Sequence, residues 1–325
     1  MKRTFALGCL ALCLALLPAH AEEKQKPKTW ADPKAAAAED PDFLIQGEYR
    51  HDEMGAQVVS LGGGLFDVYL LEGGLPGAGW EPGKKKTALK GARKGEPAGI
   101  DGFTVTLESG FITVSDSEGG KRKLERIDRE SPTLAAKPPE GAVVLFDGSS
   151  ADEWENGKVI DGHLQASGTT SKRRFGDYKL HLEFRTPYMP AARGQGRGNS
   201  GIYHSGRWET QILDSFGLEG MENETGGIYS VAKPRLNMCL PPLAWQTYDV
   251  DFTAARFDAE GKRTAWPRIT VKLNGITVHE DLELAKDNTG SAPLSGPLTS
   301  PEGPVYLQNH GNPVVFRNIW VVPGK

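Results

Sequence analysis

The sequence contains few cysteines, and only one lies in the part of the chain expected to fold. Of its 3 cysteines, Cys9 and Cys13 fall within the first 21 residues, and Cys239 alone lies beyond them. One cysteine cannot close an internal disulfide, which excludes the small disulfide-stapled domains of secreted proteins. Cys239 stands beside Pro241 without any nucleophile signature around it, so we interpret it as a small apolar loop side chain.

Long apolar runs are lacking after the N-terminal leader. The run from Phe5 to Leu17 follows two basic residues and ends in small ones. This pattern predicts a secretory signal peptide at residues 1–21, cleaved after Ala21. No later run is long enough to span a membrane. We therefore expect an exported bacterial protein that is periplasmic or extracellular.

The chain also lacks a strong excess of either charge. Its formal net charge is −4, and removal of the predicted signal peptide lowers this value to −6. Nucleic acids and anionic membranes bind basic patches, so neither is expected as a partner. The sequence leaves the oligomeric state open.

A sustained helical period is missing as well, and the pattern predicts an all-β protein. Residues 22–42 are expected to form a linker or marginal helix, and residues 43–131 a small antiparallel β domain. The Pro-rich residues 132–140 predict a second linker. The many short strands between Gly and Pro turns in residues 141–325 predict a jelly-roll β-sandwich.

The predicted strands are short runs of alternating or apolar character. In the first domain they cover residues 55–60, 65–71, 103–108, 110–115 and 121–127. In the second domain they cover residues 143–146, 159–166, 178–186, 201–204, 208–214, 245–257, 268–273, 276–281, 305–308 and 314–322. The Asn274-Gly275 pair between two of them predicts a tight β-hairpin.

Alternation along these strands predicts which polar side chains share a face. His181, Glu183 and Arg185 alternate with apolar neighbours and are expected to point away from the core. Glu209 and Gln211 likewise share a face. If both faces belong to one concave sheet, they form a polar floor of the kind on which jelly rolls bind sugars.

Several fragments in order along the second domain resemble the 3-keto-disaccharide hydrolase family. The fragments are residues 175–180, 183–185, 199–202, 209–214, 307–311 and 315–319. The resemblance covers roughly residues 140–322 and leaves the first β domain outside it. It implies a concanavalin-like β-sandwich, export from bacteria, and action on glycosides whose sugar ring is oxidised at C3.

The chemistry that this resemblance implies assigns roles to four side chains. A ketone at C3 acidifies the hydrogen on C2, so a base can remove it, the enolate can expel the C1 substituent, and water can add back. Glu209 is the candidate base and Arg185 the candidate charge stabiliser or sugar clamp. His310 or His204 is the candidate acid for the leaving oxygen.

Further polar residues are expected to bind the substrate or orient these groups. They are Asn199, Ser200, Gln211, Asp214 and Gln308. Asp214 is out of phase with Glu209 unless a β-bulge intervenes. No cofactor is assigned. Binding of a divalent cation stays an open alternative, because carboxylate and imidazole groups can be its ligands; the candidates are Glu209, His204, His310 and Asp214.

Four alternatives remain open at this point. Glu209 and Asp214 could act as the paired carboxylates of direct glycoside hydrolysis. Outward Glu and Arg side chains are also common as surface ion pairs. The domain could instead be a non-catalytic carbohydrate-binding module that stacks sugars on tryptophans, or a structural protein. The candidate stacking residues are Trp154, Trp208, Trp245 and Trp266.

Overall fold

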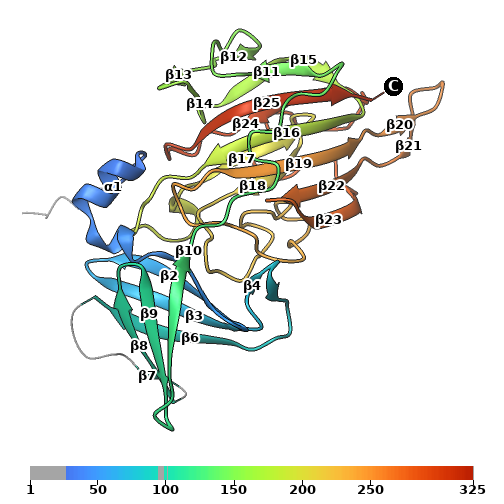
Figure 1. Cartoon of the computed structure of the whole chain (residues 1–325). Coiled ribbons are helices and arrows are strands. Elements are labelled where there is room, and N and C mark those ends of the chain that lie inside the picture. The colour runs from blue at the N-terminus through green and yellow to red at the C-terminus, as the bar shows by residue number, and fades with distance from the viewer. Residues whose placement is uncertain (1–26, 94–98, 101, 325) are drawn as a thin grey trace, which may run out of the picture.

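The computed structural model describes residues 27–93, 99–100 and 102–324 and consists almost entirely of antiparallel β-structure. The predicted signal peptide lies outside these residues. Figure 1 shows two β units stacked on each other, with the N-terminal unit below and the C-terminal unit above. Each unit has its own hydrophobic core. No helix in the described part of the chain is long and apolar enough to cross a membrane.

The N-terminal unit is a single eight-stranded sheet with the strand order β6-β3-β2-β1-β10-β9-β8-β7. Its strands are β1 (Gly47–His51), β2 (Met54–Gly62), β3 (Leu65–Glu72), β6 (Lys86–Ala92), β7 (Gly99–Ile100), β8 (Phe103–Glu108), β9 (Phe111–Asp116) and β10 (Lys121–Ile127). Two short strands, β4 (Leu75–Pro76) and β5 (Gly79–Trp80), form a separate parallel pair. The sheet curls so that Gly91 in β6 lies against the Leu107 side chain in β8, enclosing the core.

The tract expected as a linker before this sheet is folded against both units. It forms helix α1 (Pro33–Glu39), capped by the Asp32 side chain, and a 3-10 turn η1 (Pro41–Leu44). Trp30 pairs through its backbone with Tyr188 of the C-terminal unit. The Tyr188 hydroxyl donates to Ser60 Oγ in the N-terminal sheet, so this tract and Tyr188 join the two units.

The C-terminal unit is a sandwich of two sheets. The larger sheet contains β11 (Val143–Phe146), β13 (Val159–Ile160), β14 (His163–Gln165), β16 (Tyr178–Arg185), β19 (Gln246–Thr253), β22 (Arg268–Leu273), β23 (Ile276–Glu283) and β25 (Val315–Pro323). The smaller sheet contains β12 (Trp154–Glu155), β15 (Thr169–Phe175), β24 (Gly303–Leu307), β17 (Ser200–His204) and β18 (Trp208–Ile212), in that order. The remaining elements are the hairpin β20 (Arg256–Phe257) with β21 (Arg263–Ala265) and the 3-10 turn η2 (Gly194–Gly196).

The sandwich core follows from strand alternation. Leu180, Leu182 and Phe184 of β16 are buried in the main core cluster, facing the smaller sheet. Asn274 and Gly275 join β22 to β23 and both have positive φ values, as a type I′ turn requires. The fold class predicted from the sequence is therefore confirmed: an all-β protein with a jelly-roll sandwich.

The second predicted linker lies across the outer face of the larger sheet. Ala135 donates its backbone N–H to Glu183 Oε1, and Thr133 donates its hydroxyl to Asp249 Oδ2. Asn318 of β25 donates to the Ala136 carbonyl. This segment covers part of the face that alternation predicted to be a polar floor.

Candidate active site

The candidate site is built on the hairpin of β17 and β18 in the smaller sheet. The connection is the three residues Ser205, Gly206 and Arg207, of which the first two have positive φ values. The register places Tyr203 directly opposite Glu209. Since side chains alternate between faces, both project from the face of the smaller sheet that points away from the sandwich core.

Glu209 is enclosed but lacks a cationic partner. Its exposed fraction is 2%, and Oε2 accepts a hydrogen bond of 2.8 Å from the Tyr203 hydroxyl. Burial raises the pKa of the Glu209 carboxyl to about 7, although the bond from Tyr203 acts in the opposite direction. No described residue forms an ion pair with it. A carboxyl with a pKa near neutrality can exchange a proton with a substrate at physiological pH.

Gly201 provides the space that the Glu209 carboxylate occupies. A Cβ at this position would lie 2.1 Å from Glu209 Oε1, so no other residue type fits without moving the carboxylate. The backbone of Gly201 is not in the left-handed region, and the requirement is one of space alone. Oε1 itself accepts no hydrogen bond from the described residues, which leaves it free to take a proton from a ligand.

Tyr203 can respond to the protonation state of Glu209. Its hydroxyl lies 2.8 Å from Glu209 Oε2 and 2.9 Å from the Gly290 carbonyl oxygen, but it has one hydrogen to donate. When Glu209 is ionised, that hydrogen stabilises the carboxylate; when Glu209 is protonated, it can turn to Gly290. Gln308 Nε2 donates to the Tyr203 oxygen at 3.0 Å and holds it in place. Burial and the nearby Glu209 raise the pKa of Tyr203 well above its usual value, so it acts as a donor.

A cluster of buried amides adjoins this pair. Asn199 Nδ2 and Gln211 Nε2 both donate to Gln195 Oε1, at 2.9 and 3.2 Å. Two oxygens in the cluster, Asn199 Oδ1 and Gln308 Oε1, are buried without a hydrogen-bond partner among the described residues. Unpaired buried acceptors are costly and call for a donor, such as a sugar hydroxyl or a water molecule. Among the predicted binding residues, the structure thus brings Asn199, Gln211 and Gln308 together near Glu209.

His204, predicted as an alternative acid, lies on the opposite face of the sheet. Its Nδ1 and Nε2 lie 2.8 Å from the Tyr178 hydroxyl and from Thr210 Oγ1, respectively, inside the sandwich core. Burial lowers the pKa of His204 to about 3, so it stays neutral. The prediction that His204 is the acid is wrong, because His204 follows Tyr203 directly in β17 and adjacent side chains of a strand point to opposite faces. Ser200 is equally out of phase and donates to the Gln308 carbonyl, where it supports the strand pairing.

Arg185, predicted as the clamp, belongs to the other sheet. It ends β16 on the outer face of the larger sheet, where it donates to the Ala31 carbonyl at 3.0 Å and stacks on Trp245. Arg185 is half-buried, whereas its neighbours on that face, His181 and Glu183, are buried beneath the 131–139 segment. The prediction of one shared polar floor for Arg185 and Glu209 is therefore wrong.

Asp214 and His310 lie at the margins of the cluster. Asp214 forms a buried ion pair with Arg197 at 2.7 Å, and Arg197 also donates to the Ser60 carbonyl of the N-terminal unit. This contact ties the units together rather than orienting Glu209. His310 is exposed in the loop after β24, two residues beyond Gln308.

The residues considered as metal ligands do not converge. Over the described ranges, no group of three or more His, Cys, Asp or Glu side chains is placed to hold an ion. His204 and Glu209 lie on opposite faces of the sheet, and Asp214 is committed to Arg197. Burial raises the pKa of the Cys239 thiol to about 12, so this side chain is not a thiolate ligand.

Three residues of the site were not predicted from the sequence: Tyr203, Gln195 and Gly201. The signal for Tyr203 was available, because a three-residue loop between His204 and Trp208 sets the register that pairs Tyr203 with Glu209. The role of Gly201 requires the position of the Glu209 carboxylate, which no sequence pattern gives. Tyr306 also joins the face, with its ring 5.5 Å from that of Tyr203.

The fold is a β-sandwich of the glycosyl hydrolase-like class. Residues 141–322 match the 3-keto-alpha-glucoside-1,2-lyase-like domain, and the chain belongs to this family. The match begins after the N-terminal sheet and covers the sandwich. A search of curated proteins finds no match.

Two solved structures from Parabacteroides distasonis ATCC 8503 are similar to the chain, and both are provisionally described as glycosyl hydrolases. The first is 31% identical with a TM-score of 0.52, covering 57% of this chain and 85% of its own. The second is 19% identical with a TM-score of 0.42, covering 57% of this chain and 95% of its own.

Proposed function

We propose that the protein is an exported enzyme that cleaves 3-keto-glycosides, with Glu209 as the base that removes the C2 proton. The family and the solved structure at 31% identity together support a role in cleaving glycosides. The observation that carries the assignment of Glu209 is its environment: a buried carboxyl with a pKa near 7, one oxygen free, and no cation beside it.

The proposed reaction runs in three steps. Glu209 Oε1 takes the proton from C2, and the electron pair of that C–H bond passes into the enolate of the C3 ketone. The enolate then expels the C1 substituent, which leaves with a proton, and forms a double bond between C1 and C2. Addition of water across this bond, with hydroxyl to C1 and a proton to C2, gives net hydrolysis. The word lyase in the family description fits the elimination step.

The surrounding residues have supporting roles in this proposal. Tyr203 donates to ionised Glu209 and turns to Gly290 when Glu209 has taken the proton. The unpaired oxygens of Asn199 and Gln308 accept sugar hydroxyls. His310, exposed beside Gln308, supplies the proton for the leaving oxygen. Export rests on the N-terminal leader pattern.

The test is turnover of 3-keto-trehalose or a 3-keto-glucoside by wild type and Glu209→Gln. We expect the variant to lose roughly 10²- to 10⁴-fold in kcat, the usual contribution of a general base. Glu280→Gln, which alters an exposed glutamate in the other sheet, serves as the matched control. Full turnover by Glu209→Gln contradicts the assignment, and sugar binding without cleavage by wild type favours a carbohydrate-binding module.

A further inference from the structure

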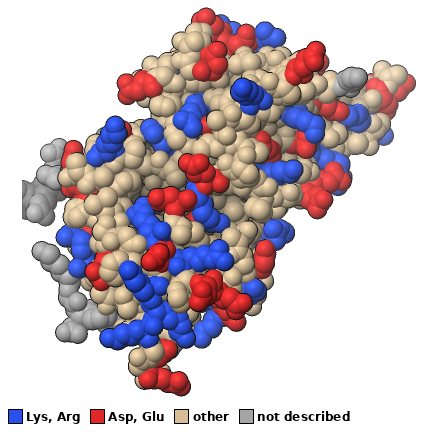
Figure 2. All heavy atoms as spheres, viewed as in Figure 1, with Lys and Arg blue, Asp and Glu red and all other residues tan. Residues whose placement is uncertain are grey.

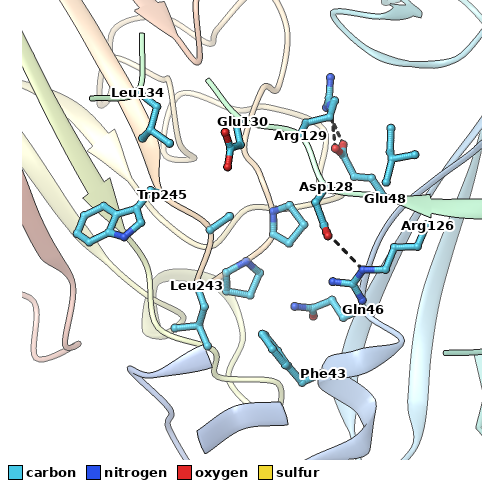
Figure 3. Close-up of a pocket in the computed structure, with 14 residues that line it drawn as sticks. Phe43, Gln46, Glu48, Arg126, Asp128, Arg129, Glu130, Leu134, Leu243 and Trp245 are labelled. Atoms are coloured by element: carbon cyan, nitrogen blue, oxygen red, sulfur yellow. Dashed lines mark hydrogen bonds and ion pairs between the residues drawn. The ribbon is translucent and has the colours of Figure 1, made fainter. Parts of the chain in front are cut away.

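A cavity lies between the two units, away from Glu209. It has a volume of about 260 Å³ and is lined by the N-terminal unit, the 126–134 segment and the 241–245 loop of the sandwich (Figure 3). Pockets for drug-sized ligands start at roughly 300 Å³ and occur preferentially at domain interfaces. The occupant of this cavity is therefore smaller, about the size of a single sugar ring.

Gln46 presents an unpaired donor to this cavity. The side chain is 1% exposed, and its Oε1 accepts the backbone N–H of Ser60 at 2.9 Å. This bond fixes the orientation of the amide, because the nitrogen cannot accept from Ser60. Nε2 is consequently turned toward the middle of the cavity (Figure 3), where it has no partner among the described residues.

The charges that line the cavity are largely neutralised. Arg129 pairs with Glu48 at 2.6 Å, and Arg126 pairs with Asp128 at 3.4 Å. Glu130 forms no ion pair with a described residue and points its carboxylate toward the cavity (Figure 3). An unpaired carboxylate repels anions and accepts hydroxyl hydrogens, so the lining favours an uncharged ligand with several hydroxyl groups.

The remaining wall is largely apolar. It includes Phe43, Leu134, Pro241, Pro242 and Leu243. Leu243 has a φ value of 68°, which is rare for a bulky residue and is held by its N–H bond to the Thr186 carbonyl at 3.0 Å. Strained backbone of this kind gathers at binding sites. A sugar ring can place its C–H groups on such a wall while its hydroxyls reach Gln46 and Glu130.

We propose that this interdomain cavity is a second binding site for an uncharged polyhydroxylated ring of monosaccharide size, with Gln46 as donor and Glu130 as acceptor. The family match begins at residue 141, after the residues that form most of the lining, so the site depends on the combination of the two units. The proposal does not depend on cleavage at Glu209.

The test uses D-glucose as the probe and saturation-transfer difference NMR on the intact protein. In Gln46→Glu the side chain keeps its acceptor for Ser60 and loses the donor in the cavity. We expect glucose to bind wild type with a Kd in the millimolar range, and the signal to fall at least fivefold in Gln46→Glu. D-glucuronate is expected to bind more weakly than glucose, because Glu130 opposes its charge.

A second variant provides an independent test in case Gln46→Glu does not fold. Leu134→Trp fills the cavity from a partly exposed position and is expected to remove the same signal. Turnover of a 3-keto-glucoside should stay within about twofold of wild type in both variants, which separates this site from Glu209. Absence of glucose binding to wild type, as for a cavity that holds water only, overturns the proposal. An unchanged signal in both variants, or tighter binding of glucuronate, overturns it equally.

Discussion

Glu183 and Glu209 are both buried strand glutamates of one sandwich, yet their surroundings are opposite. Their exposed fractions are 0% and 2%. Burial alone would raise the pKa of Glu183, but the nearby His181 and hydrogen bonds from Asn318, Arg317 and the Ala135 backbone together lower it to about 2. Glu209 has one neutral donor, and burial raises its pKa to about 7. The supply of donors, rather than burial, therefore decides whether a carboxylate holds the fold together or can accept a proton.

The surface gives no comparable contrast. Figure 2 shows Lys and Arg intermixed with Asp and Glu over the visible face of both units. Exposed pairs such as Lys179 with Asp251 contribute little in water. The charges that distinguish the two sheets of the sandwich are therefore the enclosed ones.

Exchanging each glutamate for glutamine should change stability in opposite directions. Glu183 has a depressed pKa, so its contribution to the free energy of unfolding is present above pH 4.5 and is lost as pH falls toward 2. Glu183→Gln should therefore lower the free energy of unfolding by about 3 kcal/mol at pH 7.

Glu209 has a raised pKa, so the cost of ionising it in the folded protein appears as pH rises through 4.5 to 7. Glu209→Gln should therefore raise the free energy of unfolding by up to about 3 kcal/mol at pH 8 and leave it unchanged at pH 4.

Urea unfolding of both variants at pH 4 and pH 8 measures these changes in the free energy of unfolding. Glu280→Gln, on the exposed surface of β23, provides the baseline. A loss of stability in both variants at pH 8 would remove the distinction between the two sites.

Adding a methyl group at Gly201 should weaken catalysis without removing the base. Gly201→Ala places a Cβ where Glu209 Oε1 lies, so the carboxylate must shift. A displacement near 1 Å at a reacting group costs about 100-fold in kcat. The control is Gly196→Ala, since a Cβ at Gly196 meets nothing within 4 Å and its φ is not positive. Wild-type kcat in Gly201→Ala would show that the carboxylate position is unimportant.

Removal of the Tyr203 hydroxyl should move the pH profile in a predictable direction. That hydroxyl stabilises ionised Glu209, so Tyr203→Phe raises the pKa of Glu209 further, and the acid limb of kcat moves to higher pH by about one unit. Tyr306→Phe, which removes a neighbouring hydroxyl that does not bond to Glu209, is the matched control. A shift to lower pH would show that Tyr203 does not donate to the carboxylate.

The sequence predicted the strands well because alternation and Gly/Pro turns report local structure directly. The predicted ranges 121–127, 143–146 and 268–273 coincide with β10, β11 and β22. Strands with weaker patterns, such as β15 with its run of Lys172, Arg173 and Arg174, were missed.

The site was only partly predictable, for two physical reasons. Alternation gives the face of a side chain within its own strand but not the sheet to which the strand belongs, so Arg185 was placed with Glu209 although they lie in different sheets. His204 was predicted as an acid because of its residue type alone. It pairs with Trp208, the residue before Glu209, and its side chain therefore points to the core side of the sheet. The prediction that Glu209 and Gln211 share a face depends only on alternation within one strand, and in the structure both side chains lie on the same face of β18.

The most direct measurement is the pKa of the two glutamates themselves, from carboxyl ¹³C NMR shifts followed over pH, with Glu183→Gln and Glu209→Gln used to assign the signals. We expect a pKa near 7 for Glu209 and near 2 for Glu183. A Glu209 pKa at or below the ordinary glutamate value of about 4.3 would contradict the claim that its enclosure makes it the base.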